Sequence, residues 1–456
     1  MTARHRLILV FVWLAFGVHA VYGTHIRSAD ISVEAVCGSE TFKITITAYV
    51  NTTSSSQFGE YDGWLYFGDG SSHDIVETAA TPRPDLGVNI GVVVYTIHHT
   101  YAAKGTYQIV YREGDRNNGI LNMTNSGDTD YISYVIINTD HDFGCNRYPV
   151  LDIPPVDRAC YKNIFTHVPG VTDADGDSIS YELTTPLQSV NTPVNGYVAP
   201  QHSKFYTNFN AGNEAGTGPP LFYVDAESGL ITWDAPGMVG EYNIAFKIIE
   251  RRHDPVSNTY VMLSTTVRDM QIVVEDCPNM RPDLVTPANI CVEAGTVLSF
   301  TITGTDPDND LVKIEAVSDI FSFPGDESPA TYTPFPPRFI ASDTVAKLYF
   351  KWRTDCMHAR QQPYQVTFKI TDHPPGGVPL VTFKTWSIKV IAPAPRWKSQ
   401  SLDLVNRHAK LEWQPYACAN ASAIQVWRRV GNYPYQGSIC ETGLPRALGY
   451  HLIGQV

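Results

Sequence analysis

Residues 241–248 read EYNIAFKI and residues 363–370 read PYQVTFKI, so nearly the same segment occurs twice in the chain. In each copy, every second residue is large and apolar. Strict alternation of this kind is the pattern of a β-strand with one buried and one exposed face. The two segments therefore predict the same strand in two copies of one β-sandwich. The residues of the expected buried faces are Tyr242, Ile244, Phe246 and Ile248, and Tyr364, Val366, Phe368 and Ile370.

The similarity between the two copies extends upstream of these strands. An Asp-rich run reads DADGD at residues 173–177 and DPDND at residues 306–310. Each copy then has a Trp at the end of an apolar stretch, Trp233 in the first and Trp352 in the second. The repeated order of features predicts tandem sandwiches, each near the ~100 residues that are common for such domains.

The composition is typical of an all-β protein with several domains. The chain has 456 residues, with 33 Gly, 31 Pro and 25 Tyr, and 17% of its residues are charged. Because one hydrophobic core rarely serves more than ~250–300 residues, this length indicates about three domains. We predict tandem β-sandwiches in a rod-like array. The expected domains are 24–140, 141–276, 277–391 and a partial domain at 392–456.

The N-terminus has the pattern of a secretory signal. Arg4 and Arg6 precede an apolar run at residues 7–18, and small residues follow it. The run is shorter than the ~20 apolar residues that a membrane-spanning helix needs. We therefore expect a signal peptide at residues 1–23 and a protein that is secreted or lies at the cell surface, without a transmembrane segment.

The net charge disfavours nucleic acid as a partner. The formal charge is −13 at pH 7, whereas binding to phosphates depends on clustered Lys and Arg. An acidic surface suits solubility and divalent cations.

Eight cysteines in an exported chain predict disulfides. The similar spacing in the two copies suggests the same bond twice, with a third bond in the last domain. In this scheme Cys37 and Cys356 have no assigned partner. A bond between Cys291 and Cys356 across a sandwich is an alternative pairing. The expected pairs are Cys145–Cys160, Cys277–Cys291 and Cys418–Cys440.

The two Asp-rich runs offer candidate metal ligands. Ca²⁺ takes six to eight oxygen ligands, and alternate carboxylates around a turn can supply several of them. The alternative is a hairpin turn in which Asp and Asn side chains bond only to backbone amides. Because the spacing occurs twice, weak Ca²⁺ binding in the ~10⁻⁴–10⁻³ M range is also expected. The candidate ligands are Asp173, Asp175, Asp177, Asp306, Asp308 and Asp310.

Several stretches resemble known extracellular modules. WLYFGDG at residues 64–70, followed by HTY at 99–101 and GTY at 105–107, resembles the PKD repeat, which is a β-sandwich. The two copies look like cadherin-like or Ig-like modules, and this resemblance implies calcium between domains. The last domain resembles the start of a fibronectin type III domain, with Trp413 in the expected core position.

The order of these modules is similar to that of large exported proteins of gliding bacteria of the Bacteroidetes type, which often end in a sorting domain for type IX secretion. This resemblance implies a surface protein linked to gliding or attachment. Because the last domain spans only about 60 residues, we expect the sequence to stop inside it. The matching stretches are THIRSADI from Thr24, GDRNNGILNM from Gly114, DADGDSISYEL from Asp173 and GLITWDAPGMVGEYNIAFKI from Gly229.

The sequence gives little support to catalysis, because it contains no HExxH or GxSxG motif. We therefore predict a non-catalytic structural or adhesion protein whose partners are surface glycans or other extracellular proteins. The alternative is a carbohydrate-binding accessory region of a larger exported enzyme. For that role Tyr61, Trp64 and Tyr66 are candidate sugar-stacking residues, although alternation favours core positions for most of the aromatic residues.

Overall fold

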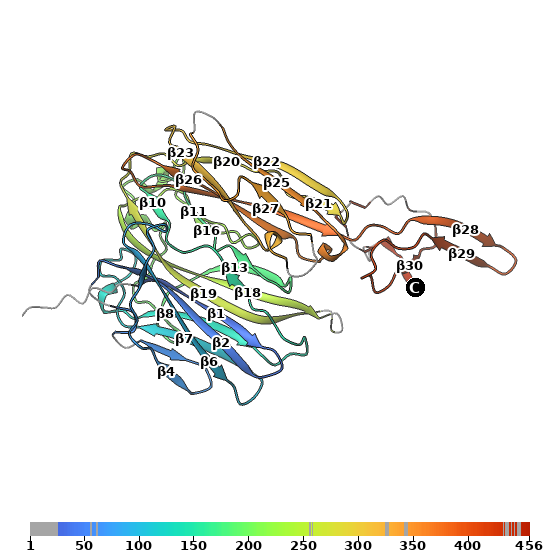
Figure 1. Cartoon of the computed structure of the whole chain (residues 1–456), viewed down its shortest axis with the longest axis horizontal. Helices are drawn as coiled ribbons and strands as arrows, with labels where there is room; N and C mark the ends of the chain where they lie inside the picture. Colours follow the sequence, from blue (N-terminus) through green and yellow to red (C-terminus); the bar gives the residue numbers. More distant parts are fainter. Residues whose placement is uncertain are drawn as a thin grey trace, which may run out of the picture.

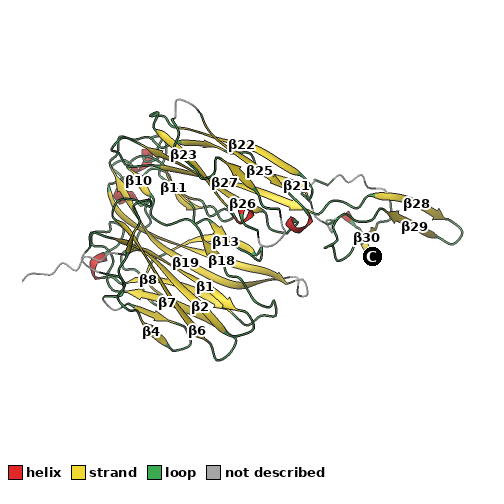
Figure 2. Cartoon of the chain, viewed as in Figure 1, coloured by secondary structure: helices red, strands yellow, loops and turns green. Residues whose placement is uncertain are grey.

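The computed structural model describes residues 26–456, with the exception of 55–56, 61–62, 255–256, 258, 324–327, 342–344, 432, 434–436, 439, 442 and 445–447. In this part of the chain most regular elements are β-strands (Figure 2), so the prediction of an all-β protein with tandem sandwiches is confirmed. The predicted signal peptide at residues 1–23 lies outside the described residues. The short 3-10 helices are η1 (Ser126–Asp128), η2 (Ser203–Phe205), η3 (Phe209–Ala211), η4 (Asp319–Phe321) and η5 (Cys356–His358).

No helix in the described residues has both the length and the apolar character that are needed to cross a bilayer.

The first unit, residues 26–140, contains two groups of neighbouring strands that enclose one core. One group has the order β1-β2-β6-β5 and the other has the order β4-β3-β7-β8. Alternate residues of β2, including Phe42, Ile44 and Ile46, are buried because one face of the strand covers the core. The strands are β1 (Ile26–Val36), β2 (Thr41–Asn51), β3 (Trp64–Tyr66), β4 (Ser72–Asp74), β5 (Thr81–Pro82), β6 (Ile90–Thr100), β7 (Thr106–Glu113) and β8 (Tyr131–Asn138).

The second unit, residues 141–276, contains the first of the two repeated segments. Tyr242, Ile244 and Phe246 pack with Trp233 in its core, so the predicted buried face is confirmed. The strands are β9 (Val150–Leu151), β10 (Arg158–Cys160), β11 (Phe165–His167), β12 (Val171–Thr172), β13 (Ser178–Thr184), β14 (Leu187–Ser189), β15 (Thr192–Pro193), β16 (Phe222–Val224), β17 (Ile231–Trp233), β18 (Gly240–Asp254) and β19 (Thr259–Glu275).

The first and second units share a sheet. Strand β19 pairs with β18 along most of its length, and it also lies between β8 and β1 of the first unit. Thr265 is opposite Ile136 of β8, and Met270 is opposite Ser28 of β1. The two units therefore lie side by side (Figure 1), and the array is more compact than the rod that we expected.

The third unit, residues 277–391, is a sandwich of two sheets with the orders β20-β22-β25-β24 and β21-β27-β26-β23. Trp352 from one sheet and Phe368 from the other are fully buried in the core, which confirms the buried face predicted for residues 363–370. The strands are β20 (Asp283–Val285), β21 (Ile290–Glu293), β22 (Val297–Thr305), β23 (Leu311–Val317), β24 (Thr331–Thr333), β25 (Ala346–Arg353), β26 (Tyr364–His373) and β27 (Val381–Ile391).

The terminal unit, residues 392–456, consists of two ribbons that extend away from the three sandwiches (Figure 1). Strand β28 pairs with β29, and β30 pairs with β31. Trp413, which we expected in a core, is half-buried. The strands are β28 (Trp397–Asp403), β29 (His408–Trp413), β30 (Gln425–Arg428) and β31 (His451–Gln455).

The disulfides join segments that are distant in the sequence, and they differ from the predicted pairs. Repeat spacing is misleading because each partner comes from a neighbouring element. Cys160, for example, ends β10 beside Glu275 of β19, two residues before Cys277. The predicted bonds Cys145–Cys160, Cys277–Cys291 and Cys418–Cys440 are therefore wrong, and the alternative Cys291–Cys356 is not formed. The observed disulfides are Cys37–Cys145, Cys160–Cys277 and Cys356–Cys418.

A buried ion pair fixes the first unit against the second. The Arg116 guanidinium donates two hydrogen bonds to the Asp269 carboxylate, with N···O distances of 2.9 and 2.7 Å, and both residues are fully buried. Its other hydrogen bonds go to Asn243 Oδ1 and to the carbonyl oxygens of Asp130 and Leu187. All five donors of this side chain are thus used, so the position of the loop that carries Arg116 is tightly specified.

The variant Asp269→Asn should lower the free energy of unfolding by about 3–5 kcal/mol, because it leaves a buried guanidinium without its counter-ion. Guanidinium chloride unfolding would measure this loss. Asp85→Asn is the matched control, because Asp85 pairs with Arg83 at the surface, where an ion pair contributes little. Equal effects of the two variants would contradict the role that we give to Asp269.

Glu113, at the end of β7, is a buried acid in the core of the first unit. It accepts hydrogen bonds from the Tyr111 hydroxyl (2.6 Å) and from the Gly59 amide (3.0 Å). Burial raises the pKa of Glu113 to about 7. Because the folded state holds the proton more tightly than the unfolded chain, the stability from this group is greatest below its ordinary pKa. It is lost as the pH rises through about 7.

Glu113→Gln should remove this dependence. The stability of the variant relative to the wild type should rise by about 3 kcal/mol between pH 4 and pH 8. Denaturant unfolding at both pH values measures the difference, and Glu34→Gln at the surface is the control. A constant difference across this range would contradict the assignment.

Candidate metal sites

The two Asp-rich runs form turns of the same construction. Residues 173–177 connect β12 to β13, and residues 306–310 connect β22 to β23. In the second unit, Asp173 Oδ1 accepts hydrogen bonds from the backbone amides of Asp175 (3.1 Å) and Asp177 (2.8 Å). In the third unit, the corresponding bonds to Asp306 Oδ1 come from the amides two and four residues later, at 2.9 and 3.0 Å. One carboxylate oxygen in each turn therefore accepts backbone amides, as expected for a hairpin turn that binds no metal.

The second oxygen of the same carboxylate has no partner in either turn. Asp173 Oδ2 and Asp306 Oδ2 are buried, and neither accepts a hydrogen bond from a described residue. Only 7% of Asp173 and 5% of Asp306 is exposed. Burial raises the pKa of Asp173 to about 6 and raises that of Asp306 above its ordinary value. Because an unpaired buried acceptor is costly, these oxygens are candidates to bind a cation.

An asparagine supports each turn from the preceding segment. Asn146 Nδ2 donates to Glu250 Oε1 at 2.7 Å, and Asn279 Nδ2 donates to Asp372 Oδ2 at 2.8 Å. The next backbone amide in each case binds the middle Asp of the turn: Arg147 N to Asp175 Oδ2 at 2.9 Å, and Met280 N to Asp308 Oδ2 at 2.6 Å. The two units thus build the same constellation from corresponding residues.

A further buried acid stands beside each turn. Glu250 on β18 and Asp372 on β26 are both fully buried. Burial raises the pKa of Glu250, and it raises the pKa of Asp372 to about 7. Carboxylate oxygens of Asp173, Asp177 and Glu250 lie within 4.8 Å of one another. Those of Asp306, Asp308 and Asp310 form a second cluster within the same limit.

Sequence reasoning missed Glu250 and Asp372, although a signal was present. Each lies two residues after the repeated segment, which ends at Ile248 in one copy and at Ile370 in the other. Extending the comparison by two residues would have found both acids.

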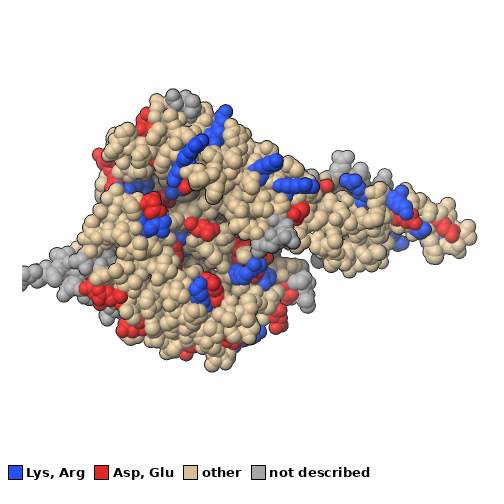
Figure 3. All heavy atoms as spheres, in the orientation of Figure 1, with Lys and Arg blue, Asp and Glu red and all other residues tan. Residues whose placement is uncertain are grey.

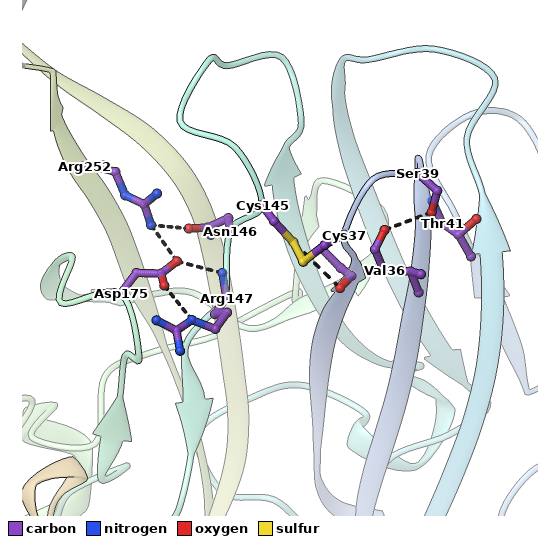
Figure 4. Close-up of a disulfide and its surroundings, with 10 residues drawn as sticks. Val36, Cys37, Ser39, Thr41, Cys145, Asn146, Arg147, Asp175 and Arg252 are labelled. Atoms are coloured by element: carbon purple, nitrogen blue, oxygen red, sulfur yellow. Dashed lines mark hydrogen bonds and ion pairs between the residues drawn. A yellow bond between two sulfur atoms is a disulfide. The ribbon is translucent and has the colours of Figure 1, made fainter. Parts of the chain in front are cut away.

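Arg252 supplies the second unit with a cation of its own. Its guanidinium donates to both oxygens of Asp177, at 2.7 and 2.6 Å, and to Asp175 Oδ2 at 2.8 Å. It also donates to Asn146 Oδ1 at 2.6 Å (Figure 4). On the other side, Arg147 Nε donates to Asp175 Oδ1 at 2.6 Å. The charges of two Asp residues in this turn are therefore largely compensated within the chain.

The third unit has no counterpart of Arg252, because Pro374 stands at the corresponding position after the repeat. Asn279 Oδ1, the counterpart of the atom that binds Arg252, is buried and has no partner in the described residues. Nor does any described Lys, Arg or His form an ion pair with Asp306, Asp308 or Asp310. The third unit therefore presents a group of oxygen atoms where the second unit holds a guanidinium.

The chemistry of the third-unit group fits a hard divalent cation. Its candidate donors are the free oxygen of Asp306, the carboxylates of Asp308 and Asp310, and Asn279 Oδ1. Ca²⁺ prefers carboxylate and amide oxygens and completes its shell with water. We call these four residues the third-unit acidic site.

The aromatic candidates lie elsewhere, on β3 of the first unit. The Trp64 and Tyr66 side chains are half-buried, and their ring centroids are 6.4 Å apart with an interplanar angle of 25°. Tyr61 lies outside the described residues. The candidate pair is therefore partly accessible.

Neither a family model nor a curated protein matches the chain. Among solved structures, it is similar to cadherin, protocadherin and titin tandem domains. Human CDH23 EC21-23 is 12% identical, with 52% of this chain and 73% of that chain covered and a TM-score of 0.18. Mouse Protocadherin-24 EC1-3 is 13% identical, with coverages of 72% and 90% and a TM-score of 0.18. The titin I-band fragment I67-I69 is 9% identical, with coverages of 80% and 99% and a TM-score of 0.14.

Replacement of Arg252 tests whether the two turns are equivalent. Arg252→Gln should destabilise the protein by about 3 kcal/mol, because three acceptor groups lose their donor. Added Ca²⁺ should restore part of this stability, and one more Ca²⁺ per chain should bind. A cavity of about 380 Å³ is lined in part by Asp173 and Asp177. Calorimetric titration with CaCl₂ measures the stoichiometry.

Arg251→Gln is the control, because the Arg251 guanidinium binds Ser180 Oγ at 2.8 Å and, within the described part of the chain, forms no bond to the turn. It should leave the number of bound Ca²⁺ ions unchanged. Loss of stability in Arg252→Gln without an additional bound ion would show that the two turns differ in more than this one side chain.

Proposed function

We propose that the protein is a non-catalytic extracellular structural or adhesion protein, in which rigidly joined β-sandwiches present a surface to glycans or to other extracellular proteins. The observation that carries the proposal is that charged and hydrogen-bonded contacts run without interruption through all three sandwiches. Domain boundaries at 24–140, 141–276, 277–391 and 392–456 are part of the same proposal.

The first link in this chain of contacts lies on β19. Arg268 is fully buried and donates to both carboxylate oxygens of Asp30 on β1, at 2.9 and 2.6 Å. It also donates to the Ile153 carbonyl oxygen at 2.8 Å. The neighbouring residue Asp269 binds Arg116 on the opposite face of the strand. Two successive residues of one strand thus hold the first unit to the second.

The second link joins the second unit to the third. His167 Nδ1 lies 2.9 Å from Asp157 Oδ2, and Lys369 Nζ on β26 donates to Asp157 Oδ1 at 3.2 Å. The backbone amide of Phe383 on β27 donates to Thr166 Oγ1 at 3.2 Å. A small apolar cluster that includes Ile153, Val168 and Phe383 lies beside these contacts. A fixed junction of this kind suits a protein whose function depends on shape.

The disulfides support an oxidising, extracellular location, because such bonds persist mainly outside the reducing cytosol. Acidic and basic side chains both occur on the face shown in Figure 3, and most of that face is uncharged. Such a surface suits recognition of glycans or proteins better than recognition of nucleic acid. The link to gliding or surface attachment rests on the resemblance of the module order to exported proteins of gliding bacteria.

The proposal includes a Ca²⁺ ion at the third-unit acidic site. The ion would give Asp306 Oδ2 and Asn279 Oδ1 the partner that they lack, and it would offset the repulsion among three carboxylates. By analogy with the guanidinium in the second unit, it would tie the turn to the preceding segment, which leads to the second unit. Calcium would therefore stiffen the array.

The test is the Ca²⁺ dependence of stability in the wild type and in Asp310→Asn. With a dissociation constant of ~10⁻⁴–10⁻³ M, 10 mM Ca²⁺ should stabilise the wild type by about 2 kcal/mol. The variant should lose this gain. Because the Asp310 carboxylate accepts no bond from a described residue, the ion-free variant should be as stable as the wild type or slightly more stable. Thermal unfolding in EDTA and in CaCl₂ measures both effects.

Asp177→Asn is the matched control at the corresponding position of the second unit. It should lower stability, because Asp177 pairs with Arg252, and it should keep the full Ca²⁺ response. If Ca²⁺ changes neither the melting temperature nor the protease sensitivity of the wild type, the calcium part of the proposal is wrong.

A further inference from the structure

Two cysteines that form no disulfide in the structure are neighbours. Cys291 lies half-buried on β21, the outermost strand of its sheet, and Cys440 lies exposed in the terminal unit. The two side chains lie close enough for their thiols to interact, and Cys291 is opposite Lys389, three residues before the terminal unit begins. Lys389, opposite Cys291 on β27, lies close enough to both thiols to interact with their charges. We propose that Cys291 and Cys440 form a fourth disulfide, which fixes the orientation of the terminal unit on the third unit.

The neighbouring contacts place the terminal unit where this bond requires it. Cys418 is already bonded to Cys356 of the third unit. Asn420 Nδ2 donates to the Cys356 carbonyl oxygen at 3.0 Å, and Cys356 Sγ lies 3.7 Å from the Ala417 carbonyl oxygen. The approach of Cys440 to Cys291 is therefore part of a wider junction between the two units.

The bond can form by thiol–disulfide exchange with a small disulfide such as oxidised glutathione. The exposed Cys440 reacts first, because burial raises the pKa of the Cys291 thiol to about 11 and keeps it protonated. The Cys440 thiolate attacks one glutathione sulfur, which gives a mixed disulfide and releases one glutathione thiolate. Cys291 then loses its proton and attacks the Cys440 sulfur, and the second glutathione thiolate leaves. The two protein thiols lose two electrons, and their two protons end on two molecules of glutathione.

The proposed bond changes what the junction can do mechanically. Without it, the terminal unit is attached through the connection at residues 392–396 and through the Cys356–Cys418 disulfide. A body held at two places can still turn about the line between them. A third bond, at an edge strand of the sandwich, removes this rotation. The inference is independent of the calcium proposal, because it concerns neither Asp-rich turn.

Peptide mapping of the full chain tests the proposal. The protein is refolded in a buffer of reduced and oxidised glutathione, alkylated without reduction, and cleaved both after Lys or Arg and before Asp. Peptide 283–305 contains only Cys291, and peptide 430–446 contains only Cys440. We expect these two peptides to be linked and to separate on reduction. Two alkylated thiols at Cys291 and Cys440 after this treatment would overturn the proposal, as would a link from either residue to another cysteine.

Serine variants provide the matched controls. Cys291→Ser and Cys440→Ser should each expose one alkylatable thiol per chain, whereas the wild type and the double variant should expose none. Both single variants keep the other three disulfides, so circular dichroism should show unchanged strand content. Protease cleavage near residues 392–396 should be faster in the single variants than in the wild type. Equal cleavage rates would contradict the mechanical role.

Discussion

The architecture depends on the burial of two successive opposite charges, Arg268 and Asp269, in the middle of β19. Because side chains alternate along a strand, the two charges lie on opposite faces and need different partners. Arg268 forms an ion pair with Asp30 in the first unit, and Asp269 forms one with Arg116 on a loop of the same unit. Removing two ion pairs from water is costly, so the arrangement contributes specificity: only one placement of the first unit satisfies both charges.

Local patterns predicted the strands well, because burial on one face leaves a period of two in the sequence. The buried faces of residues 241–248 and 363–370 were predicted correctly from this period. The shared sheet was not predictable in the same way, because β19 pairs with strands more than 100 positions away and no local pattern records a distant partner. A buried Arg-Asp pair inside an apolar strand was the available signal. The disulfide predictions were wrong for the same reason. Repeat spacing describes neighbours along the chain, whereas the bonds join neighbours in space.

The candidate site was predictable in part. Alternate Asp residues identify both turns, because the turn itself needs one carboxylate oxygen to accept backbone amides. Asn146, Asn279, Glu250 and Asp372 come from other segments, and only the folded chain brings them to the turns. The comparison of the two copies was nevertheless informative beyond the turns. It aligns Arg252 with Pro374 and Arg147 with Met280, and these two differences separate a compensated turn from an uncompensated one.

This difference gives two similar turns different responses to their surroundings. A guanidinium attached to the chain is present at a fixed local concentration, so the second-unit turn stays closed whatever the solution contains. The third-unit acidic site has corresponding oxygen atoms and no ion pair with a described Lys or Arg, and in our proposal a Ca²⁺ ion from solution balances its charge. In our proposal, the presence of Met280 and Pro374 in place of Arg147 and Arg252 converts a permanent structural contact into one that follows the calcium concentration.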